Sequence, residues 1–135
     1  MEPRRRQNKQ EEKTIQKLTV KRIKDHYGTD EDGDCNILLT CSIAGVYLQK
    51  TTIFELQSLG YLVGTCDLFI LEARKGYHGL LLELKAPDGV ASKAQEKFAL
   101  RANKNGYLAI IIEPLETKEE TIALTVQTIK DYLAK

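Results

Sequence analysis

The chain has 135 residues, of which 42% are hydrophobic and 29% charged, and its formal net charge at pH 7 is +1. These values predict one soluble domain with a real core, and they argue against a disordered chain. Because the net charge is so small, any contact with nucleic acid must come from local basic patches. No apolar stretch approaches the roughly 20 residues of a membrane helix.

The N-terminal segment "MEPRRRQNKQEEK" has no hydrophobic stretch after its basic start, so it is not a secretory signal. The three cysteines, Cys35, Cys41 and Cys66, are odd in number and show no C-x-x-C spacing. This pattern favours reduced thiols inside a cell over a disulfide framework or a structural zinc site. We therefore expect an intracellular protein.

The first half of the chain predicts two helices and one strand. Residues 1–9 are polar and basic, and we expect a flexible tail there, followed by a single domain over residues 10–135. Helices are predicted over about 10–27 and 45–59, each ended by a glycine, with a strand over 35–41 between them. The expected core positions of the two helices are Ile15, Leu18, Thr19, Ile23, Val46, Ile53, Leu56 and Leu59.

The second half predicts a hairpin from about Cys66 to Lys85, centred near Lys75. Capping boxes, Ser92 with Gln95 and Thr117 with Glu120, open two further helices. Between these helices, "YLAIII" predicts a strand buried on both faces. The expected core positions of the helices are Ala94, Phe98, Ala102, Ile122, Val126, Ile129 and Leu133. The order α-β-α-β-β-α-β-α predicts an α/β fold, a small mixed sheet with helices on its faces.

The predicted hairpin carries charged residues inside apolar runs. Glu83 and Lys85 lie in "LLLELKA", and Asp67 lies in "GTCDLFI". If the hairpin is centred as predicted, Asp67 faces Glu83 directly, and Lys85 shares a strand face with Glu83. Two facing carboxylates repel each other unless a cation lies between them. A register slip of one residue would turn the two acids to opposite faces.

This set of residues suits the hydrolysis of a phosphodiester. Asp67 and Glu83 offer hard oxygen ligands for Mg²⁺, to which the backbone carbonyl of Leu84 could add another. A divalent cation would polarise the phosphate and activate a water, while Lys85 could reach the developing charge. The alternative for Glu83 and Lys85 is a salt bridge on an edge strand, and for Asp67 a turn position.

The set resembles that of the PD-(D/E)xK nuclease superfamily, which has a restriction-endonuclease-like core. The segments "LGYLVGTCDLFI", "KGYHGLLLELKAPDGVASKAQEKF" and "NGYLAIII" make the chain from about Glu12 to Ile112 similar to the VRR-NUC (virus-type replication–repair nuclease) domain. Cys66 stands where the family usually has proline before the aspartate, and "CSIAGV" replaces a usual Asn-Gly segment.

The resemblance implies roles for particular residues. Asp67 and Glu83 match the metal-binding acids, and Lys85 matches the catalytic lysine. Glu12 matches an acidic position on the first helix, with Glu11 as the rival for that role. Gln95 matches a polar residue on the helix after the Glu-x-Lys strand, although the capping box alone would also account for it.

The resemblance implies a DNA endonuclease that uses Mg²⁺, for which Mn²⁺ could substitute. It further implies a homodimer that resolves four-way (Holliday) junctions, in the cytoplasm of a bacterium or of a virus- or phage-infected host cell. Alternatives are a nuclease acting on flaps, nicks or single strands, a non-catalytic junction-binding module, and an accessory subunit of a replication complex. No small-molecule substrate and no membrane contact are expected.

Other polar residues have simpler explanations. The basic set Lys93, Lys97, Arg101 and Lys104 forms one stripe of a helix pointing away from Gln95, which favours a solvated face. Arg4, Arg5 and Arg6 form a second basic cluster that could meet phosphates. His78 has the opposite strand parity to Glu83, and we expect it to be structural.

Overall fold

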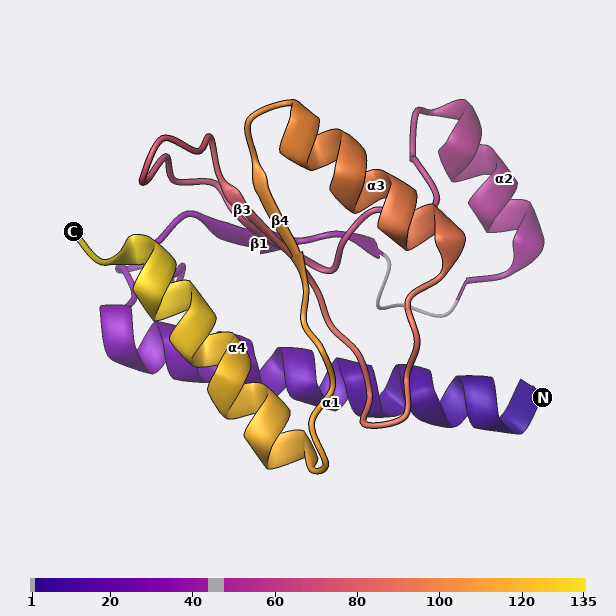
Figure 1. Ribbon diagram of the computed structural model, residues 1–135, viewed down its shortest axis with the longest axis horizontal. Coiled ribbons are helices and arrows are strands. Elements are labelled where there is room, and N and C mark those ends of the chain that lie inside the picture. The colour runs from indigo at the N-terminus through magenta and orange to yellow at the C-terminus, as the bar shows by residue number, and fades with distance from the viewer. Residues whose placement is uncertain (1, 44–47) are drawn as a thin grey trace.

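A four-stranded sheet with helices on both sides forms the domain (Figure 1). The computed structural model describes residues 2–43 and 48–135. The elements follow the predicted order and confirm the α/β class. They are α1 (Glu2–Tyr27), β1 (Leu39–Cys41), α2 (Lys50–Ser58), β2 (Leu68–Ile70), β3 (Leu80–Glu83), α3 (Lys93–Lys104), β4 (Leu108–Ile111) and α4 (Lys118–Leu133).

The sheet is mixed, with strand order β1-β2-β3-β4. β1, β2 and β3 pair antiparallel, and β4 joins β3 in parallel after the α3 crossover. Leu68 pairs with Leu82 and Ile70 with Leu80, which is the predicted hairpin register. The hairpin turns at Lys75 and Gly76, whose φ angles of 53° and 85° suit a type I′ turn.

The main core lies between the sheet and the pair of helices α1 and α4, which cross each other on one face (Figure 1). On α1, Ile15, Thr19 and Ile23 are buried as predicted, but Leu18 is 41% exposed. Apolar side chains from three sources pack together in this core: alternate residues of β2 and β3, the side of α1 that faces the sheet, and the predicted apolar stripe of α4. The α4 stripe is buried at Ile122, Val126, Ile129 and Leu133.

The other face of the sheet is covered by α3, which packs along β4. Ala94, Phe98 and Ala102 are only half-buried there, and no residue of α3 is fully buried. The prediction that "YLAIII" is buried on both faces is wrong for most of its length. Residues 108–111 are partly exposed because β4 is an edge strand, and only Ile112 is buried.

Both predicted N-terminal helices differ in extent from expectation. α1 begins at Glu2 rather than near residue 10, because the arginine, glutamine and lysine residues there are good helix formers. α2 is shorter than predicted; the expected start at Gly45 and the core position Val46 lie outside the described residues. Leu59, expected in the core, is 78% exposed, because α2 lies beside the sheet rather than over it (Figure 1).

Candidate active site at the end of the β2–β3 hairpin

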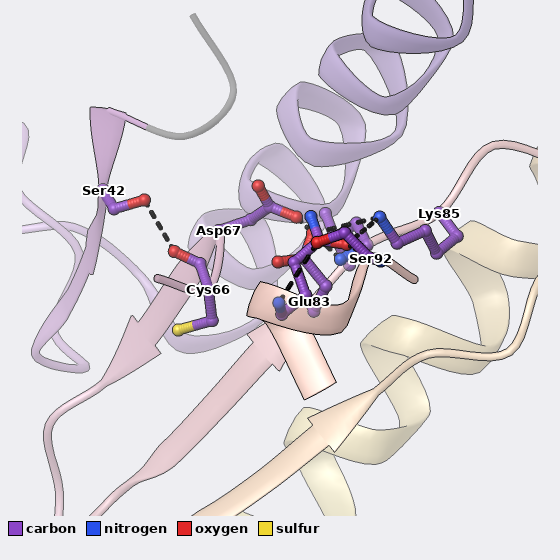
Figure 2. Close-up of polar contacts among 8 residues, drawn as sticks. Ser42, Cys66, Asp67, Glu83, Lys85 and Ser92 are labelled. Atoms are coloured by element: carbon purple, nitrogen blue, oxygen red, sulfur yellow. Dashed lines mark hydrogen bonds and ion pairs between the residues drawn. The ribbon is translucent and has the colours of Figure 1, made fainter. Parts of the chain in front are cut away.

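Four chain segments meet at one end of the sheet, where three strands end and one begins. β1 ends at Cys41, β3 ends at Glu83 and β4 ends at Ile111, while the antiparallel β2 begins beside them at Leu68. Asp67, Glu83 and Lys85 therefore lie next to one another where the strands stop (Figure 2). Each of these charged residues is at most 5% exposed. Burying three ionisable groups costs several kcal/mol for each ion, so the cluster needs a compensating interaction.

Asp67 and Glu83 lie one residue beyond the last paired positions of β2 and β3, on facing strands. Asp67 is fixed at both its backbone and its side chain. Its N–H donates to the carbonyl of Leu82 at 2.9 Å, and its Oδ2 accepts from the N–H of Leu84 at 2.7 Å. The Oε1 of Glu83, in contrast, is buried with no hydrogen-bond partner in the described part of the chain.

Burial is the largest cause of a raised Glu83 pKa, and the nearby Asp67 carboxyl raises that pKa further. Lys85 acts in the opposite direction, but its Nζ is 3.7 Å from Glu83 Oε2, beyond hydrogen-bond length. Two ionised carboxylates only accept hydrogen bonds, so neither can satisfy the other. The pair therefore requires either a shared proton or a cation between its oxygens.

Lys85 is held from the α3 side of the sheet. Its Nζ donates to Gln95 Oε1 at 2.7 Å, and the same oxygen accepts from the N–H of Ser92 at 2.9 Å. The hydroxyl of Ser92 in turn accepts from the N–H of Gln95, which completes the predicted capping box. Gln95 thus forms the capping box of α3, as the sequence predicted, and also holds the lysine, a contact that the sequence did not predict.

Glu12 approaches the cluster from α1. Burial raises its pKa, Lys85 lowers it, and Asp67 raises it again, so the carboxyl group lies within electrostatic reach of both residues. The backbone N–H of Ala86 also lowers this pKa through a hydrogen bond. Of the two rival acids on this helix, this geometry favours Glu12, one turn before the buried Ile15.

Three neighbours of the cluster gave no sequence signal as site residues. Ser42 links the end of β1 to the hairpin. Its N–H donates to the backbone carbonyl of Asp67 at 3.0 Å. Its hydroxyl donates to the backbone carbonyl of Cys66 at 2.6 Å (Figure 2). Cys66, directly before Asp67, is buried, and burial together with the two acids raises the pKa of its thiol. Tyr61 has its pKa raised mainly by burial and then by Asp67 and Glu83, which places it beside them.

Other candidates lie away from the cluster. Lys93, Lys97, Arg101 and Lys104 are all exposed along α3, as predicted for a solvated stripe. His78 is structural: its N–H donates to the Gly106 carbonyl at 2.9 Å, and its ring lies edge-on to Tyr107. The side chains of Arg4, Arg5 and Arg6 lie outside the described part of the chain.

The carboxylate oxygens at this end of the sheet suit a divalent cation as ligands. Asp67 and Glu83 face each other across β2 and β3, and the Oε1 of Glu83 is buried without a hydrogen-bond partner among the described residues. Hard oxygen pairs of this kind bind Mg²⁺. Within residues 2–43 and 48–135, no three His, Cys, Asp or Glu side chains are grouped closely enough to enclose a metal by themselves. A pair of carboxylates suits Mg²⁺ better than zinc, because Mg²⁺ keeps several of its waters.

A mixed four-stranded sheet of this topology, with helices on both faces, is consistent with a restriction-endonuclease-like fold. Neither the protein-family models nor the curated proteins give a match to this chain. Among solved structures, a VRR_NUC domain protein is similar at a TM-score of 0.67 and 23% sequence identity, over 90% of this chain and 87% of that chain. The chain therefore has the VRR-NUC fold, as the sequence motifs predicted.

Proposed function

We propose that this protein is a metal-dependent DNA endonuclease that hydrolyses phosphodiester bonds. The observation that carries the proposal is the buried pair of carboxyl groups of Glu83 and Asp67, in which Glu83 Oε1 has no hydrogen-bond partner in the described chain. The ion pair of Glu83 with Lys85 leaves this oxygen unsatisfied, and an unmade buried hydrogen bond costs about 1–3 kcal/mol. A bound cation would satisfy this oxygen, which explains why an unpartnered carboxylate oxygen is buried at the end of the sheet.

In this proposal, Asp67 and Glu83 hold the cation, with Glu12 and the carbonyl of Leu84 as further oxygen donors. The cation, Mg²⁺ or Mn²⁺, would supply Lewis-acid polarisation of the phosphate and an activated water. Lys85 donates to a phosphate oxygen where negative charge develops. Gln95 keeps the Lys85 ammonium at that position, because their 2.7 Å hydrogen bond leaves the lysine little freedom.

The expected substrate is branched DNA, in particular a four-way junction, cut by a homodimer. The fold shared with a VRR_NUC domain protein supports a nuclease acting on DNA. A two-fold assembly presents two sites, which suits the paired cuts needed to resolve a junction. The exposed lysines and arginine of α3 offer local positive charge for the phosphates, which the net charge of +1 does not provide.

The test is cleavage of a labelled four-way junction, a flap, a single strand and a linear duplex, each with Mg²⁺ and with EDTA. Symmetric paired cuts in the junction support resolution, and a single cut near the fork supports a flap nuclease. Binding to the junction without any cut, in Mg²⁺ and in Mn²⁺, would show a non-catalytic binding module instead.

Lys85→Ala tests the mechanism directly. We expect loss of cutting by about 10²-fold or more, with nearly unchanged DNA affinity, because the lysine acts on charge that develops during reaction. Lys118→Ala is the matched control, since Lys118 is exposed at the start of α4. A Lys85→Ala protein that cuts at the wild-type rate would show that the assigned mechanism is wrong.

A further inference from the structure

The N-terminal part of α1 extends beyond the core of the domain. The helix begins at Glu2, whereas the first buried side chain among residues 7–27 is that of Ile15. Figure 1 shows α4 crossing the C-terminal half of α1, with which it packs, while the N-terminal half continues past this crossing. We call residues 2–10 the α1 arm. Burial in the core, as far as the described side chains show, does not explain why the helix includes this arm.

The α1 arm concentrates positive charge. It contains one acidic residue and four basic ones, namely Glu2 and Arg4, Arg5, Arg6 and Lys9. Because the whole chain has a net charge of only +1, the other residues together are net acidic. Cations near the N-terminus of a helix oppose its dipole, and basic residues four positions apart repel each other. This arrangement weakens an isolated helix, and a bound polyanion would relieve the repulsion.

The composition of the α1 arm also indicates which polyanion it suits. A helix that lies on a membrane surface needs an apolar face in addition to its basic residues. Apart from Pro3, the segment "EPRRRQNKQ" has only polar and charged side chains, so it offers no such face. Arginine, lysine, asparagine and glutamine are the side chains that commonly contact the phosphates of nucleic acids.

The α1 arm leads directly into the candidate active site. Glu12 lies two residues after it and approaches Asp67 and Lys85. Burial raises the pKa of the Glu12 carboxyl group, and Lys9, one turn earlier, lies close enough to lower that pKa. At 3.6 residues per turn, position 9 lies within about 60° of Glu12 around the helix axis, and position 5 within about 20°. Both basic positions therefore belong to the face of α1 that carries Glu12.

The spacing along the helix suits a DNA strand that passes through the active site. Positions 9 and 5 precede Glu12 by about 4.5 Å and about 10.5 Å along the helix axis. A strand of duplex DNA carries one phosphate for about every 3.4 Å of its axis. The basic stripe of α3 lies on the other face of the sheet (Figure 1), so α1 and α3 offer positive charge on two sides of the site.

We propose that the α1 arm binds the DNA backbone beside the cut, with Lys9 and Arg5 contacting phosphates within about three nucleotides of the scissile phosphate. The proposal rests on the proposed function for the position of that phosphate. Contacts to phosphates that do not react are the same before and during the reaction, so they contribute to affinity and register rather than to the chemical step.

DNA affinity, measured in EDTA with a labelled four-way junction and a linear duplex, tests the contact without any cutting. The double variant Arg5→Ala/Lys9→Ala should bind about tenfold more weakly or worse, and the slope of log affinity against log salt concentration should decrease by about two. In Mg²⁺ at saturating DNA, its cutting rate should stay within about twofold of wild type.

Lys13→Ala/Lys17→Ala is the matched control. It removes the same charge at the same spacing from the opposite side of α1, where both lysines are exposed, and should leave affinity and salt slope unchanged. Alanine is the best helix former, so both double variants should keep the helix, which circular dichroism checks. Equal losses of affinity in the two double variants, or none in either, would overturn the proposal.

Neutral methylphosphonate linkages locate the contact on the DNA. Placed within three nucleotides of the scissile phosphate, first on one side and then on the other, they should weaken wild-type binding and affect Arg5→Ala/Lys9→Ala much less on one of the two sides. Fully additive losses on both sides would contradict the proposal. A chain that never cuts, yet loses affinity only in the Arg5→Ala/Lys9→Ala variant, would contradict the proposed function and leave the DNA contact of the α1 arm standing.

Discussion

Lys85 Nζ and Gln95 Oε1 lie 2.7 Å apart, and the same glutamine oxygen accepts the backbone N–H of Ser92 at 2.9 Å. One side-chain atom therefore joins the end of the Glu-x-Lys segment to the first turn of α3. The position of the lysine depends on where this helix begins, because Gln95 is the third residue after the N-cap Ser92. The capping of α3 and the geometry of the proposed active site are thus one structural feature.

Replacing Gln95 tests whether this residue positions the Lys85 ammonium or only stabilises α3. Gln95→Ala should lower kcat by about 10²-fold with little change in DNA affinity, because the ammonium loses its fixed position. It should also cost about 0.5–2 kcal/mol of unfolding free energy through the lost capping box. Ser92→Ala is the matched control, since it removes the cap and leaves Gln95 beside Lys85. Equal loss of activity in both variants would mean that Gln95 acts only through helix stability.

The stability of the metal-free protein should depend on pH through Glu83. Burial, and then Asp67, raises the pKa of the Glu83 carboxyl group in the folded chain above its ordinary value of 4.5. Below about pH 4.5 the group is protonated in both states and has no effect on stability. As the pH rises above 4.5, the unfolded state ionises first, so the folded state loses stability by at most about 1.4 kcal/mol per pH unit.

Glu83→Gln should therefore be more stable than the wild type in EDTA at neutral pH, and inactive. The difference in melting temperature should grow from about pH 5 to pH 8 and vanish near pH 4. Differential scanning calorimetry at these pH values measures it. A pH-independent difference would show that the carboxyl group is ionised and satisfied in the folded state, contrary to its unpartnered Oε1.

Metal binding should distinguish Glu12 from Glu11. Mn²⁺ at 100 times its dissociation constant should stabilise the wild type by about 2.7 kcal/mol, which a thermal shift against EDTA would detect. Glu12→Gln should weaken Mn²⁺ binding by about tenfold or more, because its carboxyl lies near Asp67 and Lys85. Glu11→Gln should bind normally. The reverse result would transfer the role on α1 to Glu11.

Two glycines test how tightly the loop before Asp67 is packed against α3. Gly64 and Gly60 have positive φ angles of 96° and 108°, so alanine at either position strains the backbone by about 1–2 kcal/mol. A Cβ on Gly64 would also lie 2.4 Å from the Ala94 carbonyl oxygen, whereas nothing lies within 4 Å at Gly60.

Gly64→Ala should therefore reduce the unfolding free energy by clearly more than Gly60→Ala. It should also reduce cleavage, since a shift of the first turn of α3 moves Gln95 away from Lys85. Urea denaturation of both variants measures the first effect, and the junction assay the second. Similar unfolding free energies for the two variants would show that the contact between Gly64 and Ala94 relaxes without cost.

Much of the candidate site could be predicted from the alternation of side chains between the two faces of β2 and β3. In a hairpin, the turn fixes the register, and the two-residue period then fixes which side chains face each other. Lys75 and Gly76 could be recognised as the turn, so Asp67 opposite Glu83 was predictable. Gln95 could be recognised as part of a capping box, but its hydrogen bond to Lys85 depends on how α3 packs across the sheet.

The sequence by itself determined the order of the elements, the hairpin register and the face shared by Asp67, Glu83 and Lys85, because these depend on residues close together in the chain. Only the tertiary structure decided that Glu12 reaches the cluster, that β4 is a partly exposed edge, and that α2 stands away from the sheet. These features depend on how segments that are distant in the sequence pack against one core. The periodicity of a single segment does not show whether that segment is buried in the core or lies beside it.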